Sequence, residues 1–185
     1  MKYGYKSEAE DKAKQIRKKM GLRVVDPLPA RDLASELDVF VMPPGNLPGA
    51  PEEMVETLAS RDSGWSAATI LECERPLILY NPCHSEARQE SDLMHELSHL
   101  IEGHEPSGFD TLGGRLLSRS YDEEQEDEAA WLGGCLQLPR PAIFRAAKRG
   151  WSNEEIAERY TASVQMVRYR RNVTGVDKQL RHMSR

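Results

Sequence analysis

Two spacings of hydrophobic residues occur along the chain, and each predicts a different kind of element. Apolar residues three and four positions apart, bounded by capping and breaking residues, predict helices over residues 7–20, 51–59, 84–102 and 123–138, and a short one after Pro29. Two or three short basic helices are expected to follow. Continuous apolar runs predict strands over residues 39–42, 67–71 and 77–80, the last two as a hairpin. Residues 106–114 are expected to form a loop. Helices around a small sheet place the chain in the α+β class.

Length and charge divide the chain into two parts. Its 185 residues suffice for one domain with a small appendage. The predicted domain covers residues 1–139 and is mostly helical, and residues 140–185 form a basic helical segment. This segment carries a charge of +7 against −12 for the rest, within a net charge of −5. A basic tail either neutralises the acidic body or contacts nucleic acid or an acidic partner, and the sequence leaves both readings open.

Composition excludes several classes of protein. Hydrophobic residues make up 39% and charged residues 30%, which is typical of a soluble globular protein. The longest apolar runs are too short to cross a bilayer, and the lysine-rich N-terminus has no secretory signal. Three cysteines without C-x-x-C spacing favour reduced thiols. We therefore expect a cytoplasmic protein with no membrane partner.

The motif with the clearest chemistry is His95-Glu96-Leu97-Ser98-His99. On a helix, residues four positions apart lie on one face, roughly 5.4 Å apart along the axis. Two imidazoles so placed can bind one Zn²⁺ at about 2.0–2.1 Å each. Glu96 lies beside the first ligand, where a carboxylate can act as general base towards water.

A zinc site of this kind needs a third protein ligand. His104 is the nearest histidine, but it follows His99 by five residues, whereas the metzincin pattern requires six; we expect it in the second shell or in a loop. The alternative is a carboxylate from the acidic run 122–128, and helical phase places Glu126 at the border of the core. Helical phase alone does not exclude Glu128 or Glu123 as the third ligand.

Small residues on the same predicted helix favour a close approach to the histidine-bearing helix. They are Ala129, Ala130, Gly133 and Gly134.

Three groups of residues together resemble the ImmA/IrrE-type metallopeptidases. They are Tyr80-Asn81-Pro82, the run from Ala87-Arg88-Gln89 to His99, and Glu126-Asp127-Glu128-Ala129-Ala130 ending at Leu138-Pro139. The resemblance covers residues 67–139 well. It implies a zincin-like fold, His95, His99 and Glu126 as metal ligands, and Glu96 as catalytic base. The sequence departs from the family at Ala130, where the family often has Asn, and at Gly133-Gly134, where the family usually has Ala.

The resemblance also implies an activity. The chain is expected to be a zinc-dependent endopeptidase whose protein substrate is a helix-turn-helix transcriptional repressor of a mobile element or stress regulon, with Mn²⁺ as an alternative metal. Tyr121 and His104 are candidates for the oxyanion-stabilising role, which the sequence leaves unassigned. The alternative function is a DNA-binding or antitoxin-like regulator with a non-catalytic metal site. The absence of a suitably placed cysteine ligand and the presence of Glu96 favour the enzyme.

The basic segment carries a weak helix-turn-helix pattern. Ser152 and Glu155 have capping-box spacing, and Ser163 is placed to cap a second helix that carries Arg168, Arg170 and Arg171. Arg170 falls where such a motif needs an apolar residue. We therefore favour a packing element over a DNA-binding element.

Overall fold

The described fold is mostly helical. The computed structural model describes residues 1–60, 64–70, 74–105, 108–112 and 115–183, of which 108–112 and 115–120 are described by backbone alone. The helices of this part are α1 (Tyr5–Lys19), α2 (Ala30–Glu36), α3 (Glu52–Leu58), α4 (Glu86–Glu102), α5 (Glu123–Gln137), α6 (Arg140–Lys148), α7 (Asn153–Arg159), α8 (Val164–Thr174) and α9 (Val176–Met183), with a 3-10 turn at Pro44–Asn46. The helices predicted over 7–20, 51–59, 84–102 and 123–138 are confirmed, as is the short one after Pro29.

The described strands form a five-stranded sheet in the order β1-β3-β2-β5-β4. Its strands are β1 (Phe40–Met42), β2 (Ala67–Ile70), β3 (Leu77–Tyr80), β4 (Gly108–Leu112) and β5 (Arg115–Ser120). The β1–β3 pair is parallel and the other pairs are antiparallel. The predicted β2–β3 hairpin is confirmed, with Ala67 opposite Tyr80 and Ile70 opposite Leu77. Its connection at 71–73 lies outside the described residues.

The predicted loop over 106–114 is wrong where residues 108–112 form β4. This strand pairs with β5, which the sequence pattern also missed, and β5 joins the sheet by pairing Leu117 with Ile70 of β2. The segments of β4 and β5 have weak strand propensity of their own. They form strands because their backbone N–H and C=O groups pair with those of a neighbouring strand. The Gly113-Gly114 dipeptide between two short segments was an available hairpin signal. Residues 106–107 and 113–114 lie outside the described residues.

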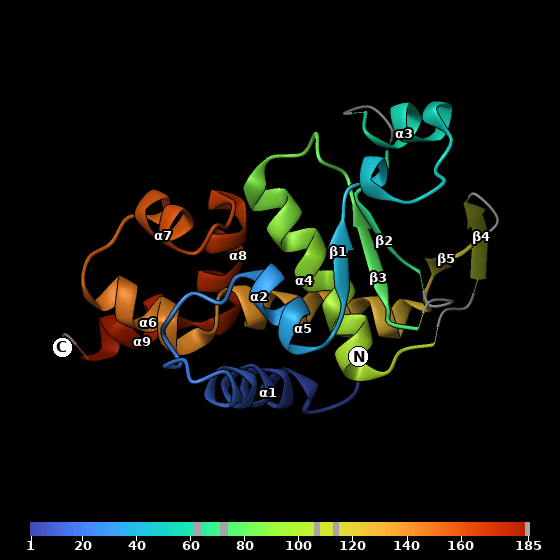
Figure 1. The fold of residues 1–185 in the computed structure, drawn as a ribbon. Coiled ribbons are helices and arrows are strands. Elements are labelled where there is room, and N and C mark those ends of the chain that lie inside the picture. Colours follow the sequence, from blue (N-terminus) through green and yellow to red (C-terminus); the bar gives the residue numbers. More distant parts are fainter. Residues whose placement is uncertain (61–63, 71–73, 106–107, 113–114, 184–185) are drawn as a thin grey trace.

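Helix α4 packs between the sheet and α5. Its apolar face is buried at Leu93 and Leu97, and Gly103, with φ of 68°, ends it in the left-handed conformation that glycine adopts without strain. Asp122 caps α5 by accepting a hydrogen bond from the Gln125 amide at 2.8 Å. Helix α1 packs on the far side of α5 (Figure 1).

Helices α6–α9 gather at one end of the molecule (Figure 1) and form a hydrophobic cluster of their own around Ile143, Ile156 and Val167. Four helices follow Pro139 in the described residues, rather than two or three, because Gly175, with φ of 66°, ends α8 before α9 begins. The predicted Ser152–Glu155 capping box is present. The division at residue 139 stays a prediction. Among the described residues, no helix is long and apolar enough to span a bilayer.

Arg170 explains the irregular helix-turn-helix pattern. Its side chain is fully buried, donates to the Leu138 carbonyl oxygen at 3.0 Å and pairs with Glu10 of α1. Position 170 is thus buried in the core, where a helix-turn-helix motif has an apolar residue. In this chain a buried ion pair takes the place of that apolar residue. Arg171 pairs with Asp177 at 2.7 Å. Two of the three arginines considered for DNA contact therefore form ion pairs within the fold, whereas Arg168 is exposed.

Candidate metal centre

The two histidines of α4 face each other on one side of the helix. Their Nε2 atoms lie 3.0 Å apart. The His99 side chain is 1% exposed, whereas that of His95 is 31% exposed. One Nε2 atom of the pair therefore lies in the protein interior and the other at the opening of the site. An ion bound at the surface of α4 could contact both.

Glu126 of α5 completes a group of three. Its Oε2 lies 3.1 Å from His95 Nε2, and its Oε1 lies 3.8 Å from His99 Nε2. Ligand atoms at about 2.0–2.1 Å from a tetrahedral zinc lie about 3.3 Å from one another. The three separations bracket that value, so the nitrogen–nitrogen–oxygen set fits a divalent metal ion. The structure thus brings together the three predicted ligands; their role as ligands stays a prediction.

Gly133 permits the close approach of α4 and α5. A Cβ at this position would lie 3.3 Å from the carbonyl carbon and oxygen of Met94 and 3.4 Å from the His95 amide nitrogen. The predicted role of small residues holds for Gly133. Gly134 instead faces the Arg170 side chain, with 3.3 Å from its Cβ position to Arg170 Cδ, and thus allows α8 to approach α5. Ala130 is exposed.

The His99 imidazole is kept neutral by its surroundings. Burial, together with the neighbouring His95 and His104, lowers the pKa of His99 to about 3. The ring of Tyr121 stacks on the His99 ring with centroids 3.6 Å apart and an interplanar angle of 14°. A neutral, sterically fixed imidazole has its lone pair available for a metal ion at neutral pH.

His104 lies behind His99 rather than in the group of three. Its Nδ1 is 3.0 Å from His99 Nδ1, and its Nε2 is 3.5 Å from Glu128 Oε2. If His99 uses Nε2 towards a metal ion, its Nδ1–H donates to His104 Nδ1, and His104 Nε2–H points to Glu128. The expectation that His104 is a second-shell residue agrees with this geometry. With both ring nitrogens so directed, His104 is a poor candidate for stabilising an oxyanion.

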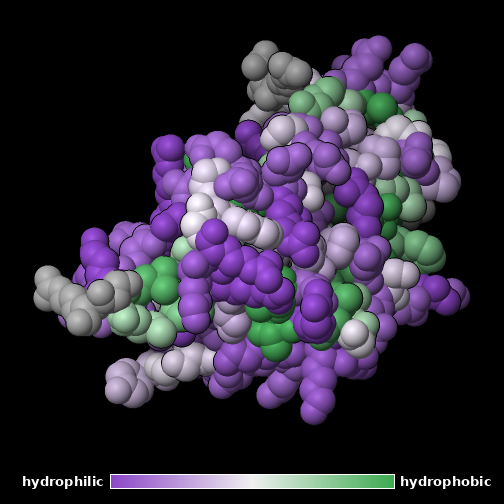
Figure 2. Space-filling model, turned by 90° about the vertical axis from the view of Figure 1, so that its left-hand side faces the viewer, coloured by the Kyte–Doolittle hydropathy of each residue, from purple (hydrophilic) through white to green (hydrophobic). Residues whose placement is uncertain are grey.

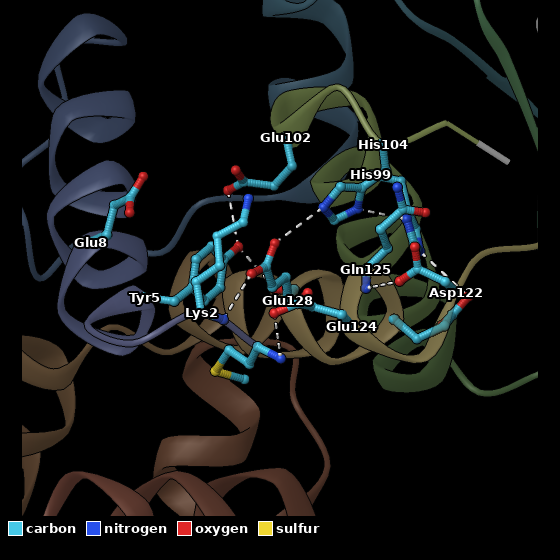
Figure 3. Close-up of polar contacts among 12 residues, drawn as sticks. Lys2, Tyr5, Glu8, His99, Glu102, His104, Asp122, Glu124, Gln125 and Glu128 are labelled. Carbon is cyan, nitrogen blue, oxygen red and sulfur yellow. Dashed lines mark hydrogen bonds and ion pairs between the residues drawn. The ribbon is translucent and has the colours of Figure 1, made fainter.

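Glu128 is buried and belongs to a network on the α1 side of α5, so it does not take the place of Glu126. Figure 3 shows its carboxylate between Lys2 and His104. Its Oε1 accepts from the Lys2 amide at 3.2 Å, and its carbonyl oxygen accepts from the Tyr5 hydroxyl at 3.1 Å. Tyr5 also donates to Glu102, which pairs with Lys12 at 2.7 Å. Glu123, the other open alternative, is exposed in the first turn of α5.

The contacts that Lys2, Tyr5 and Lys12 make with Glu102 and Glu128 join residues 90 to 126 positions apart, and no local pattern in the sequence indicates them.

Glu96 is held by a contact that the sequence did not reveal. Thr69 of β2 donates a hydrogen bond from Oγ1 to Glu96 Oε2 at 2.6 Å. Burial raises the pKa of Glu96, although the Thr69 hydrogen bond and the nearby His95 act in the opposite direction. A positioned carboxylate with a raised pKa is suited to take up and release a proton.

A family model described as Peptidase_M78, IrrE N-terminal-like domain, matches residues 52–172. This span includes β2, α4 and α5, and thus the three ligand candidates, Glu96 and Thr69, and it continues into α8. No curated protein and no solved structure matches the chain.

Proposed function

Because the chain belongs to the peptidase family of IrrE N-terminal-like domains, we propose that it is a metal-dependent endopeptidase in which His95, His99 and Glu126 hold the ion. The observation that carries the proposal is the convergence of His95 Nε2, His99 Nε2 and a Glu126 oxygen within 4.8 Å, next to Glu96. Zinc is the proposed metal, because two imidazoles and one carboxylate are a common catalytic zinc set; manganese is the alternative. When bound, zinc supplies Lewis acidity to a water molecule and to the scissile carbonyl.

Glu96 is the proposed general base. Thr69 holds Oε2, so Oε1 receives the proton of the attacking water and then delivers it to the nitrogen of the leaving amine. His104 and Glu128 keep His99 in the tautomer whose Nε2 is free. Tyr121 limits rotation of the same ring by stacking on it.

The proposed substrate is a protein, in particular a helix-turn-helix transcriptional repressor, and the proposed location is the cytoplasm. The resemblance of residues 67–139 to ImmA/IrrE-type enzymes supports this substrate class. The free thiols of Cys83 and Cys135 agree with a reducing compartment. Contact between residues 140–185 and DNA stays a prediction, and the buried Arg170 and paired Arg171 favour packing over the regulator function.

A cleavage assay tests the proposal. The probe is the purified helix-turn-helix regulator encoded beside this chain, incubated with zinc-loaded protein and analysed by mass spectrometry. Glu96→Gln is expected to retain zinc and to lower cleavage by at least about 100-fold, because general base catalysis contributes about 10²–10⁴-fold. Glu86→Gln is the matched control, since Glu86 is an exposed carboxylate on the same helix. Cleavage at the wild-type rate by Glu96→Gln would remove Glu96 as the base.

A further inference from the structure

A small hollow with a volume of about 30 Å³ opens at the end of the molecule formed by the C-terminal helices, away from α4 and α5. Four arginines line it: Arg23 before α2, Arg145 and Arg149 at the end of α6, and Arg159 at the end of α7. Figure 2 turns this end of the molecule towards the viewer and shows mostly hydrophilic residues on it. Segments distant in sequence therefore bring four positive charges to one place.

Asp26 compensates part of this charge, because it attracts Arg159 as well as Arg23. Arg23 pairs with Asp26 at 2.7 Å. Within the described residues, no carboxylate lies within ion-pair distance of Arg145, Arg149 or Arg159. Acidic residues outnumber basic ones in the chain, so a lack of carboxylates is not the reason.

Like charges that lie close together raise the free energy of the folded protein, and a bound anion lowers it. The negative end of the α6 dipole can attract Arg145 and Arg149, but it does not account for arginines contributed by two other segments.

Apolar and aromatic residues also line the hollow. Buried Ala142 and Ala146 of α6 form part of its lining. Trp151 is half-buried, with the Arg159 guanidinium carbon 5.7 Å from the Trp151 ring centroid. Tyr160 is fixed by donating to the Val25 carbonyl oxygen at 2.7 Å. Arginines beside an aromatic ring suit a ligand with an anionic group and a flat apolar part.

We propose that this hollow binds the phosphate group of a small molecule. Several guanidinium groups match the geometry and the double charge of phosphate better than those of a single carboxylate. Free phosphate and a nucleoside monophosphate share this chemistry, and the aromatic wall offers the nucleoside base a stacking surface. A volume of about 30 Å³ is far below that of small-ligand sites, which span about 300–1,000 Å³, so the hollow takes the phosphate group and not the rest of a larger ligand. The site is independent of the candidate metal centre.

Isothermal titration calorimetry on the full-length chain, at fixed ionic strength, tests this proposal. Inorganic phosphate and adenosine monophosphate are the two probes, and at least one is expected to bind saturably at one site. Arg145→Gln and Arg149→Gln should each weaken binding by about tenfold or more, because each removes charge-assisted hydrogen bonds. Lys148→Gln is the matched control, since Lys148 neighbours Arg149 in sequence, is exposed and does not line the hollow. Thermal unfolding checks that each variant is folded.

The same titrations distinguish the source of the phosphate. Tighter binding of adenosine monophosphate, lost in Trp151→Leu, would assign a nucleotide, and equal binding of both probes would assign free phosphate. Absence of binding would overturn the proposal. An equal loss of binding in Lys148→Gln would also overturn it, because this result indicates diffuse charge attraction. Loss of binding in Glu126→Gln would overturn it too, because this result places the phosphate at the metal centre. Binding of duplex DNA alone, weakened by Arg168→Gln, would also overturn it.

Discussion

Replacement of His104 by alanine tests whether the residues behind His99 set the affinity of the metal centre. The substitution removes the partner of His99 Nδ1 at 3.0 Å and leaves the buried Glu128 carboxylate without the imidazole at 3.5 Å. The side chains of His104 and Glu128 are 7% and 4% exposed, so water replaces these contacts poorly. An unsatisfied buried polar group costs about 1–3 kcal/mol. Loss of an outer-shell partner weakens metal binding by about 10–100-fold, which corresponds to a similar free energy.

Competition with a fluorescent zinc chelator measures this effect. We expect His104→Ala to raise the zinc dissociation constant by about 10–100-fold. His84→Ala is a closely matched control: the His84 side chain is also 7% exposed and lies 3.5 Å from a carboxylate, that of Asp92. It precedes α4, and within the described part of the chain it does not contact His99. Urea unfolding of both metal-free variants separates metal affinity from stability.

Wild-type zinc affinity in a folded His104→Ala protein would refute the assigned role of His104. An equal loss of affinity in His84→Ala would refute it too, because it would show a general effect of removing a buried imidazole.

Further predictions concern packing, thiol reactivity and pH. Gly133→Ala places a Cβ 3.3 Å from the Met94 backbone; overpacking of about 1–3 kcal/mol should exceed the helix-propensity gain of up to about 1 kcal/mol and lower stability in urea unfolding. Iodoacetamide should label exposed Cys83 in the native protein but Cys135 only after denaturation, because burial raises the pKa of Cys135 to about 12; equal native labelling, seen by peptide mass spectrometry, would contradict this. Burial raises the pKa of Glu90 above 4.5, so the unfolded state loses its proton first and stability falls as pH rises through that window. Urea unfolding of Glu90→Gln should therefore show a stability advantage over wild type that grows from about pH 4.5 upward, and a pH-independent difference would contradict the prediction.

Local patterns predicted the elements that carry the site, because the information lies within one or two helical turns. The 95–99 motif, the apolar stripe of Leu93 and Leu97 and the Gly103 stop together indicate α4. Helical phase placed Glu126 beside the core, and the family resemblance singled it out from Glu123 and Glu128. The structure then brought Glu126 to the two imidazoles.

Contacts between distant segments account for what the sequence did not predict. Strand β4 exists through pairing with β5, and β5 through pairing with β2, so neither segment shows a strong signal of its own. The Thr69–Glu96 hydrogen bond joins a strand and a helix 27 positions apart. Arg170 occupies a buried position because Glu10, on the first helix, neutralises it.

The most direct test of the account is the position of the metal ion itself. Crystals grown with zinc, measured at the zinc absorption edge, give an anomalous peak whose protein ligands can be identified. The account predicts one peak within about 2.0–2.2 Å of His95 Nε2, His99 Nε2 and a Glu126 oxygen. A zinc ion bound elsewhere, or one held by the two histidines with the Glu126 carboxylate turned away, would contradict it.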